Sequence, residues 1–168
     1  MKLLSFDQSS KITGISCFIN GEWQWSNIID KHKNTNTDAR FDEMVLSMYE
    51  VIEKEKPDIV VIEQVALQSN AKTMMLLARL QGAAVGKCVE MGLQYKIIEP
   101  SHWRKIVGIY QGKKKRDDLK KESMELAHKW FDESLSEDAS ESALLGVSYL
   151  IENGYTTIEY LDDAHLWD

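Results

Sequence analysis

Short apolar runs separated by turn residues dominate the start of the chain and predict strands. Residues 2 to 6 form an apolar run that ends at Asp7, and residues 15 to 19 form a second run. Asn20-Gly21 is a strong hairpin signal, and the apolar positions over residues 23 to 28 suit a strand that returns beside the second one. The chain is therefore expected to open with an antiparallel meander of three strands.

The middle of the chain alternates between helical and strand patterns. Apolar residues recur every three or four positions over Asp38 to Glu55, as in an amphipathic helix. Residues 59 to 62 are a β-branched run that ends at Glu63, which is typical of a strand buried on both faces. Ala71 to Met91 predicts a long helix that is apolar on more than one side, and Tyr95 to Ile98 predicts a further strand.

Three more helices are expected in the last third of the chain. Ser101 is expected to cap a short helix through Val107, and longer helices are expected over Arg116 to Phe131 and Asp138 to Asn153. Residues 1 to 154 are interpreted as one domain, and residues 155 to 168 as an acidic tail without a core pattern. The order of elements predicts an α/β fold: a mixed five-stranded sheet, made of the meander and two parallel strands, with helices on both faces.

Composition narrows the class of protein. With 168 residues and 43% hydrophobic side chains, the chain is long enough for one core and too short for two. Cys17 and Cys88 lie far apart in apolar surroundings, which favours buried thiols in a reducing compartment. The first carboxylate follows one short apolar run, which leaves no room for a signal peptide, so we expect a cytoplasmic location. The net charge of −7 argues against a protein that coats nucleic acid indiscriminately.

Two predicted parallel strands end at a carboxylate, Asp7 and Glu63. Ligands of open α/β sheets collect at the carboxyl ends of strands, so these acids are expected to converge. Asp138 and Glu141 lie three positions apart on one face of a predicted helix and are candidates to complete the cluster. Because grouped carboxylates repel one another, they favour hard divalent cations, which indicates Mg²⁺, with Mn²⁺ as a substitute.

Two such ions about 4 Å apart would activate a water molecule and stabilise the departing oxygen during phosphodiester cleavage. Spacing alone leaves another interpretation open, because acids at strand ends and in the first turn of a helix also serve as caps and solubilising groups. The four histidines and two cysteines show no zinc-ligand spacing.

Three sequence blocks carry a resemblance to a known family. They are residues 4 to 10 (Leu-Ser-Phe-Asp-Gln-Ser-Ser) with Thr13-Gly14, residues 61 to 65 (Val-Ile-Glu-Gln-Val), and residues 138 to 144 (Asp-Ala-Ser-Glu-Ser-Ala-Leu). In these blocks the chain resembles the RuvC family of Holliday junction resolvases, and most of all its smaller bacteriophage members. The resemblance implies a ribonuclease H-like fold and a location in the cytoplasm of the bacterial or phage-infected cell.

The resemblance also implies that the four acids form the catalytic and metal site. Family members keep an acid after the first strand, a Glu-Gln pair after the fourth strand, and two acids that open the last helix. Asp7, Glu63, Asp138 and Glu141 fill these positions. The final acid of the family is commonly aspartate, so Glu141 lengthens the reach to a metal by one methylene. The implied activity is that of a magnesium-dependent crossover junction endodeoxyribonuclease, with two ions per active site and paired symmetric nicks.

A homodimer joined through the helix over Ala71 to Met91 is implied as well. Small residues along this helix would let two helices approach closely: Ala78, Gly82, Ala83 and Gly86. The pattern by itself also suits a helix buried in its own core, and both interpretations stay open. In cellular resolvases an aromatic residue shortly after the Glu-Gln pair contacts the junction centre, whereas Ala66 and Leu67 stand here. This departure indicates a broader range of branched DNA, including flaps and forks.

One dense basic patch stands out in this acidic chain, and phosphates are its natural partners. The patch consists of Lys113, Lys114, Lys115, Arg116, Lys120 and Lys121. Arg104 matches a position where the family keeps a basic residue near the scissile phosphate, and Lys115 or Arg116 matches another. Taken alone, the patch also suits a solvated loop and helix start. Trp103, which lies between apolar neighbours, is expected to be a packing residue.

Two other function classes are compatible with these residues. One is a ribonuclease H-like nuclease with another substrate, such as an RNA-DNA hybrid, because a fold does not determine its substrate. The other is a non-catalytic, junction-binding architectural protein that uses the basic patch and keeps the acids for structure. Metal-dependent cleavage of competing substrates separates the three.

Overall fold

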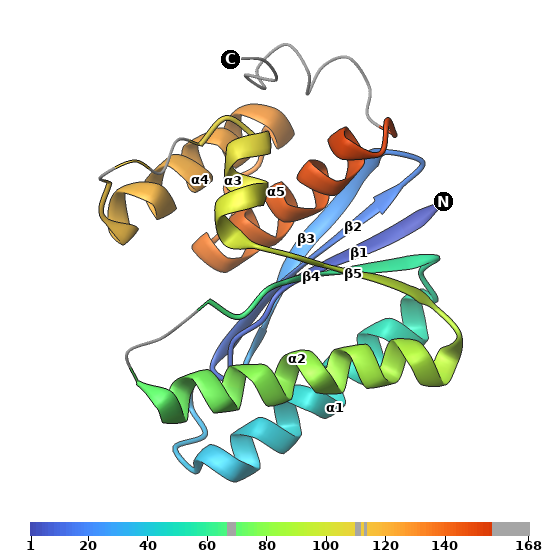
Figure 1. The fold of residues 1–168 in the computed structure, drawn as a ribbon, viewed down its shortest axis with the longest axis vertical. Helices are drawn as coiled ribbons and strands as arrows, with labels where there is room; N and C mark the ends of the chain where they lie inside the picture. Colours follow the sequence, from blue (N-terminus) through green and yellow to red (C-terminus); the bar gives the residue numbers. More distant parts are fainter. Residues whose placement is uncertain (67–69, 110–111, 113, 156–168) are drawn as a thin grey trace.

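A computed structural model of the chain describes residues 1–66, 70–109, 112 and 114–155. Within these residues, five strands form one mixed sheet in the order β3-β2-β1-β4-β5 (Figure 1). The strands are β1 (Lys2–Asp7), β2 (Ile12–Ile19), β3 (Glu22–Asp30), β4 (Ile59–Glu63) and β5 (Gln94–Ile98). β2 pairs antiparallel with β1 and β3, whereas β4 pairs parallel with β1 and β5. The predicted meander and the two parallel strands are confirmed.

Helices cover both faces of the sheet, as predicted. α1 (Thr37–Glu55) and α2 (Ala71–Met91) lie on one face, and α3 (Pro100–Ile106), α4 (Arg116–Phe131) and α5 (Glu137–Glu152) lie on the other (Figure 1). The α/β fold class is therefore confirmed. None of the helices that the structure describes is both long and apolar enough to cross a membrane.

Successive residues of the central strands enter two different cores. Leu3 and Val61 pack in a cluster with residues of α3, α4 and α5. Their neighbours Leu4 and Val60 pack in a second cluster with residues of α1 and α2. Because side chains alternate in direction along a strand, a strand covered on both faces buries successive side chains and is mostly apolar along its length. This explains the uninterrupted apolar run that leads to Glu63 and the largely apolar run that leads to Asp7.

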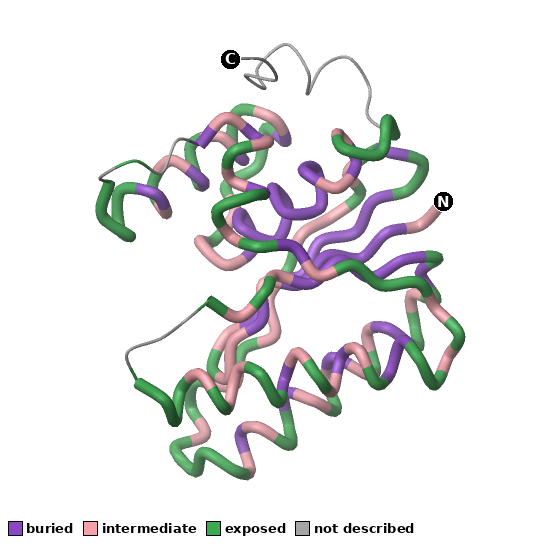
Figure 2. The backbone as a smooth tube through the Cα atoms, in the orientation of Figure 1, coloured by how far each residue is buried: buried purple, intermediate pink, exposed green. Residues whose placement is uncertain are grey.

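α5 is the helix that packs most deeply against the sheet (Figure 2), with residues 139–148 and 150 all buried. Two glycines allow this close approach. A Cβ at Gly14 would lie 1.9 Å from the carbonyl oxygen of Asp138, and a Cβ at Gly146 would lie 2.3 Å from the ring of Phe18. Gly14 is also the register partner of Asp7 on β1. The start of α5 is thus held directly beside the end of β1.

Serine hydroxyls fix the register of α5 on the sheet. Ser5 Oγ donates to the carbonyl oxygen of Ser142 at 2.7 Å, and the Ser142 hydroxyl lies 2.8 Å from that of Ser16. All three serines are fully buried. Buried hydroxyls are stabilising only when they are paired, so a shift of α5 along the sheet would leave them without partners.

The predicted helix cap at Ser101 is wrong. α3 begins at Pro100, and Glu99 takes the cap position without a side-chain hydrogen bond. Proline has its φ angle preset for the first position of a helix and lacks the N–H that would go unpaired there, so the cap and the helix start lie two residues earlier than predicted. The other predicted helices have boundaries within one residue of those observed.

Several predicted features lie outside the described residues. These are Leu67, Lys113 and, apart from Tyr155, the proposed tail over residues 155–168.

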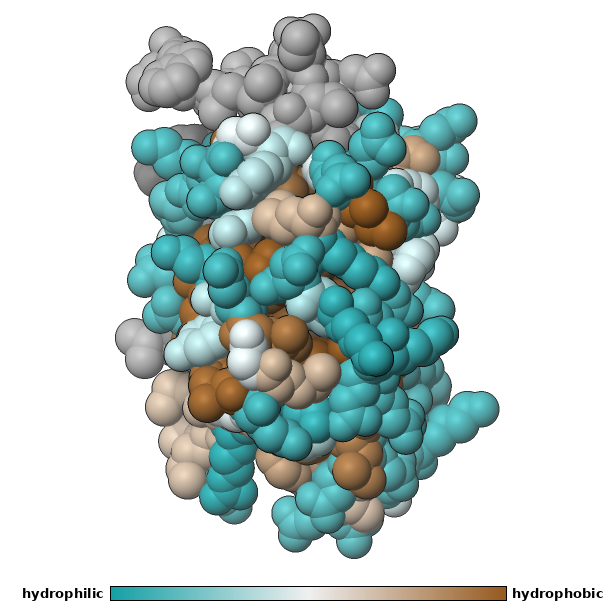
Figure 3. Space-filling model, turned by 90° about the vertical axis from the view of Figure 1, so that its right-hand side faces the viewer, coloured by the Kyte–Doolittle hydropathy of each residue, from teal (hydrophilic) through white to brown (hydrophobic). Residues whose placement is uncertain are grey.

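Figure 3 views the molecule from the side on which β1 begins, away from the carboxyl ends of β1 and β4. On that face, hydrophobic side chains form separate patches divided by hydrophilic ones.

Candidate active site

A pocket of about 880 Å³ opens at the carboxyl ends of β1 and β4, and all four predicted acids line it. Asp7 is the last residue of β1, Glu63 is the last residue of β4, and Asp138 and Glu141 lie in the first turns of α5. The parallel pairing of β1 and β4 places their carboxyl ends side by side. Three segments that are far apart in the sequence therefore deliver four carboxylates to one place.

The carboxyl group of Asp7 is buried and has three other acids close to it. Burial raises the pKa of Asp7 well above its usual value, and the negative charges of Glu63, Glu141 and Asp138 raise it further, in that order. The positive charge of Arg104 opposes this shift. Burial likewise raises the pKa of Asp138, where the neighbouring Glu137 adds to the effect. The other three acids are thus close enough to Asp7 to penalise its ionisation.

Glu63 is held by contacts to both its backbone and its side chain. Burial raises the pKa of Glu63 to about 7, against the opposing charge of Arg104 and a hydrogen bond from Trp103. Trp103 Nε1 donates to Glu63 Oε2 at 2.7 Å, and Gln8 Nε2 donates to the Glu63 carbonyl oxygen at 2.6 Å. Glu63 is consequently fixed from two directions before any ligand binds.

Glu141 is paired with a cation. Arg104 Nη2 donates to Glu141 Oε1 at 2.6 Å, and both side chains are largely buried. The guanidinium carbon of Arg104 also lies 4.6 Å from the ring centroid of Trp103, within the range of a cation–π contact. Arg104 therefore lies inside the acidic pocket, as a counter-charge to Glu141.

The donor set suits a hard divalent cation. Four carboxylates that face one pocket supply the oxygen ligands that Mg²⁺ and Mn²⁺ prefer. Their mutual repulsion, which raises the pKa of Asp7, is the charge that a cation would neutralise. Among the described residues, no three His, Cys, Asp or Glu side chains are already arranged to hold one ion. The chemical type of these ligands therefore suits such a cation. To bind it, Glu141 would have to release its ion pair with Arg104.

The predicted basic patch is largely neutralised by acids of this chain. Lys114 pairs with Glu122 at 2.6 Å, Lys121 pairs with Glu125 at 3.7 Å, and Lys120 pairs with Glu137. Lys120 still lines the pocket, and so does Arg116 at the start of α4. Lys115 precedes α4 as its cap residue, with its backbone N–H bonded to Asp118. Of the patch, Arg116 and Lys120 reach the acids, and Lys114 and Lys121 do not line the pocket.

Among the described residues, four cations on other segments line the same pocket, one of them Arg40 of α1, and sequence analysis missed them. Lys11 lies in the loop after β1, and Lys72 and Arg79 lie on α2. None of them has a basic residue beside it in the sequence, so no run of charge marks them. Only the fold brings them to the pocket that holds the four acids.

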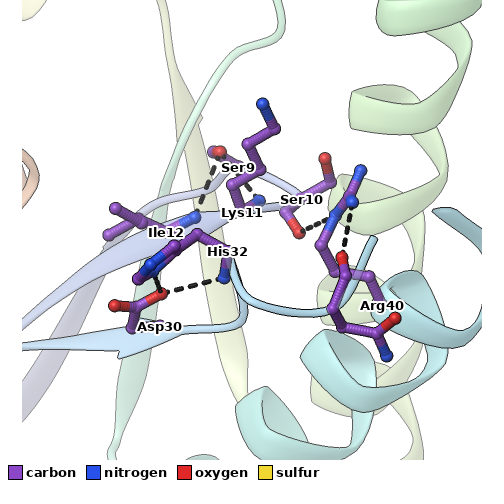
Figure 4. Close-up of polar contacts among 8 residues, drawn as sticks. Ser9, Ser10, Lys11, Ile12, Asp30, His32 and Arg40 are labelled. Carbon is purple, nitrogen blue, oxygen red and sulfur yellow. Dashed lines mark hydrogen bonds and ion pairs between the residues drawn. The ribbon is translucent and has the colours of Figure 1, made fainter. Parts of the chain in front are cut away.

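The loop that carries Lys11 is fastened to the start of α1 (Figure 4). Arg40 Nε donates to the carbonyl oxygen of Ser10 at 3.1 Å, and Arg40 Nη1 donates to the carbonyl oxygen of Asn34 at 2.8 Å. The Arg40 side chain is buried, so these bonds are shielded from water. Ser9 Oγ accepts from the Lys11 backbone N–H at 3.2 Å, which tightens the turn. These hydrogen bonds therefore fix the loop that forms the wall of the pocket beside Asp7.

Trp103 has a role beyond the predicted one. It is fully buried, so the prediction that it packs in the core is confirmed. Its indole N–H nevertheless bonds to Glu63, a contact that pairs residues 40 positions apart. No local pattern in the sequence signals such a contact.

Comparisons with known proteins agree with this geometry. The family model described as "Crossover junction endodeoxyribonuclease RuvC" matches residues 3–130, a stretch that includes Asp7, Glu63 and Arg104 and ends before Asp138. A search of curated proteins by sequence found no match.

Two solved structures share the fold across most of the chain. RuvC of Thermus thermophilus in complex with a Holliday junction substrate has a TM-score of 0.72 at 11% identity, over 92% of this chain and 98% of that one. The yeast mitochondrial Holliday junction resolvase Ydc2 has a TM-score of 0.59 at 13% identity, over 91% of this chain and 79% of that one. At such identities the likeness establishes the ribonuclease H-like fold and nothing finer. Because the family match covers more than half of the chain, the protein belongs to the RuvC family.

Proposed function

We propose that this protein is a divalent-metal-dependent endonuclease that resolves four-way DNA junctions by paired nicks. The observation that carries the proposal is the convergence of Asp7, Glu63, Asp138 and Glu141 on one pocket in a chain of the RuvC family. Relatives of the same fold include resolvases, and one of them is described in complex with a Holliday junction. Phosphodiester hydrolysis by such a cluster requires neither a histidine base nor a covalent intermediate.

Each group of the pocket has a distinct part in this chemistry. Asp7, Glu63, Asp138 and Glu141 would hold Mg²⁺ or Mn²⁺, and two bound ions would activate a water molecule and stabilise the departing oxygen. Arg104 neutralises the charge of Glu141 in the metal-free site. Because Arg104 lines the pocket, it would also bind a phosphate that enters the pocket. Arg116 and Lys120 lie on the same pocket and would position the phosphate.

DNA contacts are proposed on both sides of the acids. Arg104, Arg116 and Lys120 flank the acids from α3 and α4, and Lys11, Lys72 and Arg79 flank them from the β1–β2 loop and α2. Phosphate contacts of this kind set register and orientation on the backbone without reading the sequence. Because these basic residues lie around one pocket, the protein offers a local anion site although its net charge is −7.

A homodimer through α2 is proposed from the face of the helix that stays exposed. Met75 is 53% exposed and Val89 is 65% exposed, whereas Leu80, Ala84 and Cys88 fill the core on the other side. The exposed face also holds Gly82 and Gly86, where an added Cβ would meet nothing within 4 Å. Glycine in a helix interior costs about 1 kcal/mol relative to alanine. No contact among the described residues requires these glycines, whereas close approach of a second α2 would require them.

The test is cleavage of labelled four-way junction, flap, RNA-DNA hybrid and linear duplex by the wild type and Asp7→Asn. Each substrate is incubated with Mg²⁺, Mn²⁺ or Ca²⁺. Paired nicks in the junction with Mg²⁺ or Mn²⁺, absent in Asp7→Asn, are expected because the variant removes a charged oxygen ligand without changing the shape of the side chain.

Other outcomes favour the alternatives. Cutting of several branched DNAs at similar rates would keep the nuclease and widen its substrate class. Preferred cutting of the hybrid would indicate a different ribonuclease H-like activity. Tight junction binding without cutting in any of the three cations would indicate an architectural protein.

A further inference from the structure

The indole of Trp103 links two of the four acids, and neither the family match nor the sequence pattern assigns it that part. Its N–H donates to Glu63 Oε2 at 2.7 Å, and its ring lies under the Arg104 guanidinium at 4.6 Å. Arg104 in turn donates to Glu141 Oε1 at 2.6 Å. A single buried side chain thus contacts one acid directly and the counter-charge of another.

Trp103 is itself held rigidly. Its side chain is fully buried in the core between the sheet and α3, α4 and α5. Its backbone N–H donates to the Glu99 carbonyl oxygen at 3.1 Å, and its carbonyl oxygen accepts from Val107 at 3.2 Å. A donor on a fixed, buried ring orients a carboxylate more tightly than a flexible surface donor does, because little conformational freedom is left to lose.

The contact leaves part of the carboxylate available. In the part of the chain that the structure describes, Trp103 is the residue that hydrogen-bonds to the Glu63 carboxylate, and it does so at Oε2 alone. Gln8 acts on the backbone of Glu63 instead, through the carbonyl oxygen. The rotation of the Glu63 side chain is therefore set by the indole, while Oε1 stays free to bind a cation.

We propose that Trp103 is a positioning residue that orients the Glu63 carboxylate toward a divalent cation through its indole N–H and seats Arg104 against Glu141 through its ring. The inference rests on the proposed function, because it assigns Trp103 to the same metal site. Residues that orient metal ligands typically alter metal affinity or activity 10- to 100-fold when they are replaced. Because Trp103 is fully buried, it would act through Glu63 and Arg104 and not on the substrate itself.

Trp103→Phe is the variant that tests the N–H, because it keeps an aromatic ring in the core. Trp23→Phe is the matched control: Trp23 Nε1 donates to Ser26 Oγ at 2.9 Å, so it loses the same kind of bond away from the acids. Ca²⁺ binding is measured by calorimetry on both variants and the wild type. We expect Trp103→Phe to weaken Ca²⁺ binding about 10-fold or more and Trp23→Phe to leave it unchanged. On the four-way junction, kcat should fall by a similar factor for Trp103→Phe while KM changes little.

An NMR measurement tests the contact between the Trp103 indole N–H and Glu63 even if Trp103→Phe fails to fold. The indole N–H signal of Trp103 is identified by elimination, using phenylalanine variants of the other tryptophans. The signal should shift in metal-free Glu63→Gln and again when Ca²⁺ is added to the wild type, whereas the Trp23 signal should stay in place. An unmoved Trp103 signal, or equal Ca²⁺ affinity in Trp103→Phe and Trp23→Phe, would overturn the inference.

The two proposals fail separately. If the wild type cuts none of the four nucleic acids, the proposed nuclease function fails, while calorimetry and NMR still decide the role of Trp103. If the wild type cuts junctions but Trp103→Phe binds Ca²⁺ as the wild type does, the function stands and the inference about Trp103 fails.

Discussion

At the scale of single residues, three of the pocket acids, Asp7, Glu63 and Asp138, are costly to ionise in the metal-free protein. Burial and mutual repulsion raise the pKa of Asp7 and Asp138, and burial raises the pKa of Glu63 to about 7. A carboxyl group with a raised pKa favours the folded state at low pH and loses that contribution as the pH rises through its folded pKa. The metal-free protein should therefore be less stable in mild alkali than in mild acid.

Glu63→Gln should stabilise the metal-free protein while abolishing cleavage. In the wild type, the contribution of Glu63 is fully present below its unfolded pKa of 4.5 and is lost as the pH rises through about 7. Glutamine carries no charge, so the variant should be about 1–3 kcal/mol more stable than the wild type at pH 8 and little different at pH 5. Urea unfolding with a chelator present measures both values. Equal stability of the two proteins at pH 8 would mean that the Glu63 charge is already compensated within the chain.

Gly14→Ala should weaken the packing of α5 against the sheet and lower the stability of the protein. The added Cβ would lie 1.9 Å from the Asp138 carbonyl oxygen, a distance that forces the start of α5 to move. We expect a loss of about 1–3 kcal/mol in unfolding free energy and weaker Ca²⁺ binding, because Asp138 moves with its backbone. Gly82→Ala is the control, since an added Cβ at that position meets nothing within 4 Å. A Gly14→Ala protein with wild-type stability and Ca²⁺ affinity would contradict this account.

Acids and glycines could be predicted from the sequence to different extents. The convergence of Asp7 and Glu63 on one pocket could be predicted, because each acid ends a strand-like apolar run and parallel strands bring their carboxyl ends together. The reason for Gly14 could not be predicted, because the atom that excludes its Cβ belongs to Asp138, far along the chain. The same limit applies to Trp103, whose packing was predictable from its neighbours but whose bond to Glu63 was not.

At the scale of elements, α4 and α5 together determine which basic residues face the acids. Lys120 of α4 pairs with Glu137 at the start of α5, next to Asp138. The bounds of α4 match the predicted ones because its apolar positions recur with helical spacing. Which of its lysines are neutralised could not be predicted, because a run of positive charge in a sequence does not show the acids that fold against it.

The basic residues of α4 should differ in their effect on DNA binding. Arg116 lines the pocket, whereas Lys121 is 78% exposed, pairs with Glu125 and does not line it. Arg116→Ala is expected to weaken binding of the four-way junction about 5- to 10-fold and to lower the salt dependence of binding. Lys121→Ala should change the affinity less than about 2-fold. Fluorescence anisotropy with a labelled junction at several salt concentrations distinguishes the two; similar losses would place DNA on the outer face of α4.

At the scale of the whole molecule, two copies joined through α2 would place two acidic pockets on one particle. The exposed face of α2 combines apolar residues with Gly82 and Gly86, where an added Cβ would meet none of the described residues within 4 Å. The sequence indicated small residues on this helix but could not tell a core-facing stripe from an exposed one. The fold separates them, because Leu80, Ala84 and Cys88 turn inward and Met75, Gly82 and Val89 turn outward.

Gly82→Leu should convert a dimer into monomers. The leucine meets open space within its own protomer, so folding is expected to be retained, but it would hold a second α2 away. Sedimentation velocity measures the change. Glu125→Leu, which also places leucine on an exposed helix position, is the control that should leave the assembly unchanged. A wild type that sediments as a monomer, or a Gly82→Leu protein that stays dimeric, would rule out this interface.

The most direct test of the central claim is cutting of a plasmid that carries one extruded cruciform. A resolvase with two coupled sites makes both nicks within one binding event, so the account predicts linear plasmid with Mg²⁺ from the wild type and uncut plasmid from Asp7→Asn. Uncut plasmid with the wild type, despite binding to the cruciform, would contradict the claim that Asp7, Glu63, Asp138 and Glu141 form a junction-cleaving site.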